Sequence, residues 1–383
     1  MATVNYSHTQ YSGVWNLNSH IGAKAAATWP SPPEPRLLAW GQNAYGQLGL
    51  GNTTYYSSPK QVGSLTTWSK VVGEQHTIAV KTDGTLWSWG YNDNGQCGLG
   101  NRTQYSSPKQ IGALTSWLSV AAGYNITMAI KTDGTLWGWG KNHQGQLGLG
   151  NRTYYSSPKQ VGSLTTWYKV ECAGNRTMAI KTDGTLWTWG NNESGQLGLG
   201  NTTKYSSPKQ VGSLTTWSQI ATGSDHSIAI KTDGTLWTWG SNNQGRLGLG
   251  NSTYYSSPKQ IGALTNWSII SSDSSHVLSI KTDGTLWSWG VNGSGQLGDG
   301  STTNRSSPVQ IGALTSWYLL STGSGQSVSI KTDGTLWVWG TNSSGELGLG
   351  NRTNYSSPKQ VGSLTTWTAI GCGSSSTNAI AAV

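Results

Sequence analysis

The side chains best suited to chemistry fall at fixed intervals, because the chain repeats one unit. His76, His226 and His276 share one position of three units, yet no carboxylate or cysteine recurs with them as in a metal site. Asp93 and Glu193 lie in different units, so they do not form an acid and base couple. The aspartates of the repeated Lys-Thr-Asp-Gly segments sit in predicted hairpin turns, where a structural role is sufficient. We therefore expect no catalytic, metal or cofactor site and no enzyme activity.

A comparison between the copies shows which positions the unit holds constant and which it varies. The segments KTDGTLW, SSPKQ and GSLTTW barely change, whereas two loops, one of them directly after Trp-Gly, change at nearly every copy. Their polar side chains suit contacts to protein or carbohydrate, and loops on a rigid scaffold commonly carry recognition. Neutral drift after duplication is the alternative, since exposed loops tolerate change. The candidate binding residues are Gln42, Tyr45, His76, Tyr91, Asp93, Tyr124, Lys141, His143, Arg176, Asn191, Glu193, Asp225, His226, Asn243 and His276.

The repeat is marked by the dipeptide Trp-Gly, spaced by fifty residues except for one gap of forty-nine. The 383-residue chain contains 53 Gly and 22 Trp but no Phe, a bias that copying of one motif produces naturally. Seven copies of the dipeptide predict an all-β fold, a seven-bladed β-propeller. The copies begin at Trp40, Trp89, Trp139, Trp189, Trp239, Trp289 and Trp339.

Four short segments of each unit are expected to be strands. Asp-Gly between the second and third is a strong hairpin signal, and Pro258 places the fourth at the outer edge of its sheet. Trp237 and Trp239 project from one face of their strand, where they can pack against the adjacent blade. Because strand direction alternates, we expect both variable loops on one face, around the channel mouth. In one unit the strands are residues 217–223, 227–231, 236–239 and 257–261.

The two ends of the repeat region are expected to share one blade. Residues 368–373 and 378–383 match the first two strands of a unit, whereas residues 37–40 and 59–62 match the third and fourth. Pairing of these segments would close the ring and remove an exposed sheet edge. We therefore assign residues 36–383 to the propeller and the preceding residues 1–35 to a docking or linker segment.

Charge, cysteines and hydropathy exclude other classes of function. The formal net charge is +9, but much of the lysine recurs once per unit, so we expect solvated, evenly spread charge and no nucleic-acid partner. The three cysteines lack metal or disulfide spacing and are expected to be small buried residues. No stretch approaches the roughly 20 apolar residues of a membrane helix, and the start lacks a signal-peptide layout, so no membrane insertion is expected.

The unit, written GSxHSIAIKTDGTLWTWGxNxxGQLGLGN, resembles the repeat of the regulator of chromosome condensation family over residues 36–383. The resemblance implies a seven-bladed propeller and diverse functions: nucleotide exchange on a small GTPase, accessory domains of ubiquitin ligases, and inhibition of a β-lactamase in bacteria. The short units contain no inserted wedge that could open a nucleotide site, which weakens the exchange-factor interpretation. The first 35 residues, with GVWNLNSHIGAKAAATWP, resemble a structural-protein module of marine bacteriophages, although a plain linker is the alternative.

The leading hypothesis is therefore a bacteriophage virion component, either a tail appendage or a capsid decoration, made in the host cytoplasm. Residues 1–35 would bind other virion proteins, and the variable face would contact a host surface protein or glycan. The alternative is a bacterial module for protein–protein interaction or inhibition, located in the cytoplasm.

Overall fold

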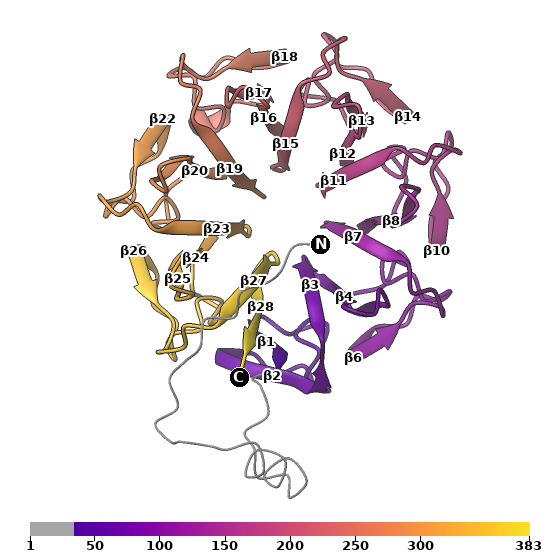
Figure 1. Cartoon of the computed structure of the whole chain (residues 1–383), viewed down its shortest axis with the longest axis vertical. Coiled ribbons are helices and arrows are strands. Elements are labelled where there is room, and N and C mark those ends of the chain that lie inside the picture. The colour runs from indigo at the N-terminus through magenta and orange to yellow at the C-terminus, as the bar shows by residue number, and fades with distance from the viewer. Residues whose placement is uncertain (1–33) are drawn as a thin grey trace, which may run out of the picture. The chain divides into compact units, whose positions relative to one another are not determined.

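The computed structural model describes residues 34–383, which form a ring of seven four-stranded sheets (Figure 1). The predicted all-β, seven-bladed propeller is confirmed, and the only helix in this range is a single 3-10 turn, η1 (Asn243–Gly245). None of the described residues form a helix long and apolar enough to cross a membrane. The compact unit starts at Pro35, which is the first residue of a strand and lies one residue before the boundary expected from the sequence.

Each blade has the same strand order from the channel outward. The innermost strands are β3 (Trp68–Gly73), β7 (Trp117–Gly123), β11 (Trp167–Ala173), β15 (Trp217–Thr222), β19 (Trp267–Ser272), β23 (Trp317–Thr322) and β27 (Trp367–Cys372). The second strands are β4 (His76–Lys81), β8 (Ile126–Lys131), β12 (Arg176–Lys181), β16 (His226–Lys231), β20 (His276–Lys281), β24 (Gln326–Lys331) and β28 (Ser376–Ala382). The third strands are β5 (Leu86–Gly90), β9 (Leu136–Gly140), β13 (Leu186–Gly190), β17 (Leu236–Gly240), β21 (Leu286–Gly290), β25 (Leu336–Gly340) and β1 (Pro35–Gly41). The outer strands are β6 (Tyr105–Gln110), β10 (Tyr155–Gln160), β14 (Tyr205–Gln210), β18 (Tyr255–Gln260), β22 (Arg305–Gln310), β26 (Tyr355–Gln360) and β2 (Tyr56–Thr66).

The turn between the second and third strands is fixed by its own side chains, as its sequence predicts. Asp233 Oδ1 accepts hydrogen bonds from the backbone N–H and the hydroxyl of Thr235, at 2.9 and 2.7 Å. The Thr235 hydroxyl in turn accepts a hydrogen bond from the Trp237 indole at 2.8 Å. Gly234 has a φ of +76°, and a Cβ there would lie 2.0 Å from the Thr265 carbonyl oxygen, so only glycine fits.

The core lies between blades rather than within one sheet. Trp239 is fully buried and packs, with Trp217, against Met178 and Ile180 of the preceding blade. Its indole N–H donates to the Gln196 carbonyl at 3.0 Å, so the same residue also bonds the two blades together. Burial of such a side chain contributes roughly 1.5–3 kcal/mol. The predicted packing of the paired tryptophans against the adjacent blade is confirmed.

The ring closes through both ends of the described chain. β1 pairs with β28 over seven residue pairs, from Pro35 with Ala382 to Gly41 with Ser376, and with β2 on its other side. Trp40 in β1 donates to the Glu346 carbonyl of the neighbouring blade at 2.9 Å, which is equivalent to the bond between Trp239 and Gln196. The predicted shared blade is therefore confirmed, with its four strands in the order β2, β1, β28 and β27.

Candidate functional site

Hydrogen bonds show that the two variable loops meet at one end of the blades. Gln96, in the loop after β5, donates to the side chain of Asn125, in the loop after β7, at 3.1 Å. The corresponding bond from Gln196 to Asp225 measures 3.4 Å. At the other end, the Thr132 N–H in an Asp-Gly turn donates to the Ser116 carbonyl of the link between blades, at 2.8 Å. The variable loops therefore share one face of the ring, which we call the variable face, and the constant turns occupy the other.

The backbone of the variable loops is held by constant polar groups underneath. The buried Asn92 side chain donates to the Thr103 carbonyl at 2.9 Å and accepts from the Cys97 N–H at 2.9 Å. The Gln96 side chain accepts from the Asn94 N–H at 3.0 Å. Equivalent bonds recur in other blades, for example around Asn192 and Gln196. Side chains can therefore vary on this face without moving the loops that carry them.

Three tyrosines from different loops gather on one sector of the variable face, and we call them the tyrosine cluster: Tyr45, Tyr91 and Tyr124. The rings of Tyr45 and Tyr91 lie 4.6 Å apart, between centroids, at an angle of 44°. Partial burial raises the pKa of Tyr91, and its hydrogen bond to Asp93 and the neighbouring Tyr45 and Tyr124 add to that effect. Tyr124 is 47% exposed, so an aromatic surface is open to a partner here.

A set of positively charged and imidazole side chains lies on the same face, and we call it the basic cluster: Lys141, His143, Arg152 and Lys204. Burial lowers the pKa of His143, and the charges of Lys141, Lys204 and Arg152 lower it further, which shows that these groups are close together. Lys204 also forms a 2.6 Å ion pair with Glu193, whose side chain is largely exposed. The loops between residues 41 and 204 therefore present both an aromatic and a basic cluster on the variable face.

A third variable position also contributes to the variable face, and the sequence analysis did not predict it. It immediately precedes the tyrosine, or in one copy the arginine, that begins each outer strand, and it contacts the loop after Trp-Gly. Gln104 donates to Asp93 at 3.0 Å, and Lys204 pairs with Glu193 in the equivalent place. Alignment of the copies at this position would have revealed it, because its residues change at most copies. They are Tyr55, Gln104, Tyr154, Lys204, Tyr254, Asn304 and Asn354.

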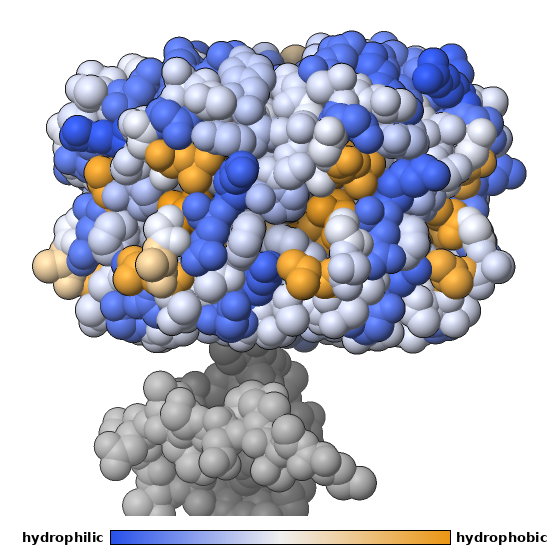
Figure 2. Space-filling model, turned by 90° about the horizontal axis from the view of Figure 1, so that it is seen from above, coloured by the Kyte–Doolittle hydropathy of each residue, from blue (hydrophilic) through white to orange (hydrophobic). Residues whose placement is uncertain are grey.

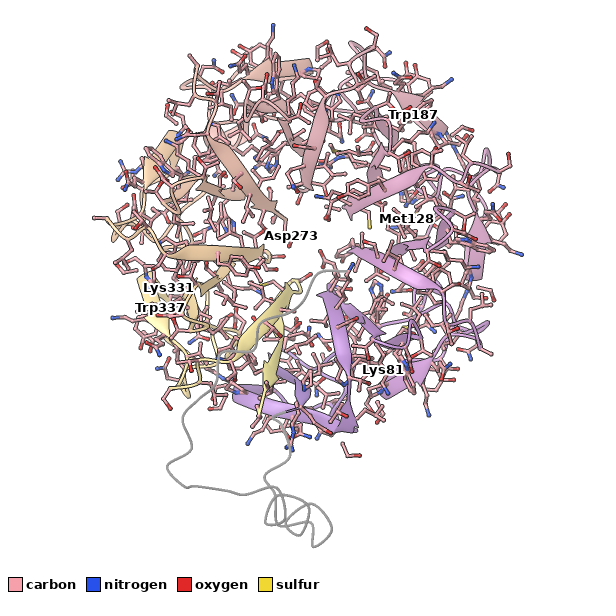
Figure 3. The ribbon with its side chains drawn as sticks, viewed as in Figure 1. Lys81, Met128, Trp187, Asp273, Lys331 and Trp337 are labelled. Carbon is pink, nitrogen blue, oxygen red and sulfur yellow. The ribbon has the colours of Figure 1, made fainter. Side chains whose placement is uncertain are left out.

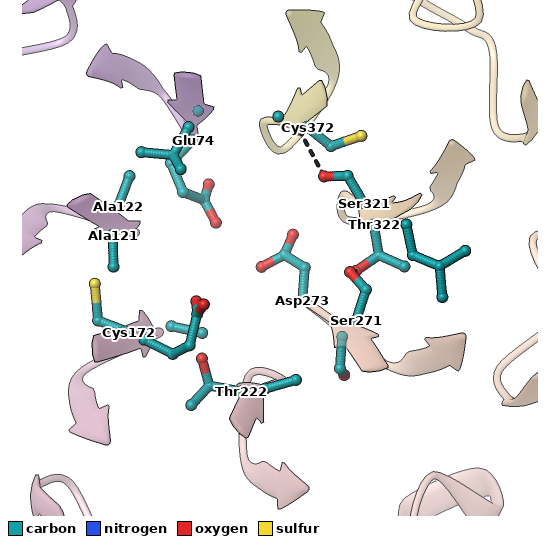
Figure 4. Close-up of a pocket in the computed structure, with 18 of the residues that line it drawn as sticks. Glu74, Ala121, Ala122, Cys172, Thr222, Ser271, Asp273, Ser321, Thr322 and Cys372 are labelled. Atoms are coloured by element: carbon teal, nitrogen blue, oxygen red, sulfur yellow. Dashed lines mark hydrogen bonds between the residues drawn. The ribbon is translucent and has the colours of Figure 1, made fainter. Parts of the chain in front are cut away.

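The central channel contains a cavity of about 230 Å³, lined by small residues and three carboxyl groups. Glu74 and Asp273 approach each other across the channel (Figure 4). Burial raises the pKa of both carboxyls; the Glu74 charge raises the pKa of Asp273 further, while a hydrogen bond from Ser374 partly offsets the rise at Glu74. Burial raises the pKa of the third carboxyl, Glu171, to about 7.

The cysteines and possible metal ligands of the described chain do not form a reactive site. Cys97, Cys172 and Cys372 are free and buried, as expected, and burial raises the pKa of Cys97 and of Cys372 to about 12. Over residues 34–383, no group of three or more His, Cys, Asp or Glu side chains is placed to hold a metal ion.

Comparison with known proteins identifies the family. The RCC1-like domain matches residues 36–379 of this chain. The chain belongs to the RCC1-like domain family. A search of curated proteins found no match to this RCC1-like propeller.

Solved structures of the same fold cover nearly all of the RCC1-like propeller. Prp20p from Saccharomyces cerevisiae is 21% identical with a TM-score of 0.80, covering 92% of both chains; its structure was described together with its binding to Gsp1p and histones. Yeast RCC1 (Prp20) bound to Kap60 gives 21% identity and a TM-score of 0.81 over 100% of this chain and 96% of that one. Human WBSCR16 gives 20% identity and a TM-score of 0.80 over 91% and 98%. At these identities the likeness shows the fold alone.

The candidate residues predicted from the sequence divide into a surface group and a buried group. Eleven of them are at least partly exposed in the loops of the RCC1-like propeller: Gln42, Tyr45, Tyr91, Asp93, Tyr124, Lys141, His143, Asn191, Glu193, Asp225 and Asn243. The other four were wrongly expected on the surface: His76, Arg176, His226 and His276 are all 0% exposed. Loop variation between copies therefore does not mean exposure at every position.

The four buried residues share one structural position, the first residue of the second strand, and their side chains bond the next blade. His76 Nε2 lies 2.8 Å from the Thr127 hydroxyl, and His276 Nε2 lies 2.9 Å from that of Ser327. Arg176 donates to the carbonyls of Ser224, at 2.7 Å, and His226. Burial lowers the pKa of His76 to about 3, of His276 to about 4 and of Arg176 to about 10. We call this the inter-blade position.

The lysines of the Lys-Thr-Asp-Gly turns were expected to be solvated, and this is wrong. Lys331 Nζ lies 3.6 Å from the ring centroid of Trp337 (Figure 3), and Lys181 Nζ lies 3.8 Å from that of Trp187. Lys331 is buried except for 7% of its surface. An ammonium over an indole face is attracted to the negative face of the ring, so these lysines are part of the scaffold.

Proposed function

We propose that this RCC1-like propeller is a non-enzymatic binding protein that recognises a macromolecular partner through its variable face. The observation that carries the proposal is the joint presence of the tyrosine and basic clusters on loops whose backbone is fixed by constant hydrogen bonds. A rigid scaffold lowers the entropy cost of binding, and tyrosine supplies contact area with few rotatable bonds.

A protein partner is favoured over a small ligand. The variable face is an open surface of separate loops, whereas the channel cavity of about 230 Å³ is lined by residues of the innermost strands and three carboxyl groups rather than by the clusters. Prp20p binds Gsp1p and histones, and it has the same fold over 92% of this chain, which supports protein recognition as a use of this architecture. The basic cluster favours a partner whose contacting surface is acidic.

Attachment to a bacteriophage particle stays a prediction. It rests on the resemblance of residues 1–35, and residues 1–33 lie outside the described part of the chain, so no comparison supports it. Copurification with phage particles tests this prediction. The full-length protein should sediment with virions, whereas a truncated protein that begins at Glu34 should not. Host surface recognition and a location in the virion depend on that result, and a bacterial interaction module is the alternative.

A photo-crosslinking pair tests the proposed binding face and captures the partner in the same step. One variant carries benzoylphenylalanine in place of Tyr124, which is 47% exposed on the variable face. The matched control carries it in place of Tyr168, which is 61% exposed and follows Trp167 at the start of β11, on the opposite side. In an extract of the source cells we expect a defined adduct with the Tyr124 variant, competed away by unlabelled parent protein. Adducts formed only through Tyr168 would contradict the proposal.

A further inference from the structure

The outer wall of the ring carries grooves at the blade boundaries, away from the variable face. Three of them have cavity volumes of about 390, 410 and 380 Å³. The groove between β10 and β14 is lined by Leu149, Leu164, Trp167, Trp187 and Pro208. Figure 2 shows apolar side chains recurring at intervals around the side of the ring between polar ones. Because the lining segments are constant between copies, the groove is a repeated feature of the fold.

Each of these three grooves contains a buried indole N–H without an acceptor among the described residues. Trp167, Trp217 and Trp317 line the grooves and are only 3–4% exposed. A buried donor that lacks a partner costs free energy, so such a group indicates a site where an acceptor can be supplied. The same unpartnered donor occurs at six equivalent positions: Trp117, Trp167, Trp217, Trp267, Trp317 and Trp367.

The one remaining equivalent position, Trp68, has an acceptor for its indole N–H. There the Trp68 indole donates to the Leu65 carbonyl at 3.0 Å, because the link before Trp68 is part of strand β2. Leu164, the counterpart of Leu65, lies outside any strand, directly after a bend at Gly162 and Ser163; it lines the groove and is 46% exposed. From the geometry at Trp68 we infer that the indole N–H of Trp167 points toward the segment of Leu164, where an incoming carbonyl could take the place of the leucine carbonyl.

Two of the three grooves are lined by a lysine, and the groove that contains Lys331 is also lined by Asp299. Lys231 and Lys331 line two of them, with Nζ 3.7 and 3.6 Å from the ring centroids of Trp237 and Trp337. The two grooves that contain Trp167 and Trp217 are lined by no carboxylate. All three grooves thus combine apolar walls with an indole N–H donor, and two of them add a lysine ammonium group.

We propose that these inter-blade grooves bind proline-rich peptides that carry an acidic residue. Proline has no N–H, and an extended prolyl chain leaves its carbonyls free to accept from an indole. Proline rings pack well in aromatic grooves, and an acidic residue complements the lysine. Sugars are a poorer fit because their hydroxyls need acceptors as well as donors, and two of the grooves contain no carboxylate. This inference is independent of the variable face.

The repetition of the groove has a consequence for affinity. A single peptide repeat would bind weakly, but a ligand with several repeats could occupy adjacent grooves of one ring. Binding would then be strengthened through effective concentration and without any new contact. The natural ligand is therefore expected to contain repeated proline-rich segments rather than one isolated motif.

The test is calorimetric titration of the full chain with a twelve-residue peptide of repeated Pro-Pro-Glu. We expect saturation at more than one peptide per chain and weaker binding of the Pro-Pro-Gln counterpart. A variant with serine at the three groove leucines and at their counterparts in three other blades should bind at least about tenfold more weakly. The substituted residues are Leu114, Leu164, Leu214, Leu264, Leu314 and Leu364. The control, Tyr45, Tyr91 and Tyr124 to serine on the variable face, should bind the peptide as the parent does.

A single-site version guards against misfolding of the multiple variant. In the parent, the peptide should shift the indole ¹H–¹⁵N signal of Trp167, and Leu164→Ser should remove that shift while leaving the shift of Trp217. Absence of peptide binding, equal binding by both leucine variants and parent, or binding of mannose or N-acetylglucosamine oligosaccharides instead of the peptide would each overturn the proposal. Loss of peptide binding would leave the crosslinking result at Tyr124 unaffected.

Discussion

Replacement of the buried histidines by glutamine should remove an acid sensitivity that the inter-blade position builds into the ring. Gln326 occupies this position in one blade, where its amide donates to the carbonyls of Gly373 at 2.8 Å and Ser376 at 3.2 Å. Glutamine is therefore compatible with the scaffold and does not titrate. The test protein is the triple variant H76Q, H226Q and H276Q.

The expected size follows from the pKa values. Burial lowers the pKa of His76 to about 3, of His276 to about 4, and of His226 well below its ordinary value of 6.5. Since the folded pKa is depressed, the stabilisation is fully present above pH 6.5 and is lost as the pH falls toward the folded value. The loss is about 1.4 kcal/mol per pH unit for each histidine, or about 4 kcal/mol at pH 5 for His76 and His276 together, and His226 adds to it in the same direction.

The measurement is urea unfolding at pH 7 and pH 5, followed by tryptophan fluorescence. The parent should lose at least about 4 kcal/mol more than the triple variant between the two pH values. The control is H143Q, because His143 is only partly buried in a variable loop, and its effect should be small. If parent and triple variant show the same pH dependence within about 1 kcal/mol, the inter-blade role of these histidines is refuted.

Three further predictions concern the ring and its channel. Glu74→Gln should raise stability at pH 7 and flatten the pH profile, because the raised pKa of this carboxyl means that its stabilisation is lost as pH rises; unchanged unfolding curves would contradict this. Deletion of residues 1–34 should preserve cooperative unfolding, whereas deletion through Trp40 should produce aggregation, measured by light scattering, because it removes β1 from the closing blade. Arg176→Ala should cost more than about 3 kcal/mol in urea unfolding and Tyr45→Ala less than about 1, since only the former leaves buried carbonyls unpaired; equal costs would refute the assignment.

Much of the fold could be predicted because the deciding interactions are local or repeated. Asp233 and Thr235 fix their turn within three residues, and the spacing of Trp237 and Trp239 sets the face that packs against the preceding blade. The closing blade followed from matching the two chain ends to one unit. These features depend on periodicity, which the sequence displays directly.

The site was predicted less well because variation and exposure are different properties. The residue at position 226 varies between copies, yet His226 starts a strand and its Nε2 lies 3.0 Å from the Ser272 hydroxyl of the neighbouring blade, forty-six positions away. Glu74 and Asp273 meet only because the ring closes. The stacking of lysine on tryptophan, as at Lys331, also required the tertiary arrangement of two strands.

The most direct test of the central claim compares two surface variants for binding to the partner identified by the Tyr124 crosslink. The first replaces Tyr45, Tyr91, Lys141 and His143 on the variable face by alanine, and the second replaces the exposed Tyr168 and Tyr318 on the opposite side. Surface plasmon resonance with the purified partner should show affinity reduced at least about tenfold in the first variant and unchanged in the second. Unchanged affinity in the first variant, with loss in the second, would place recognition on the other face and contradict the account.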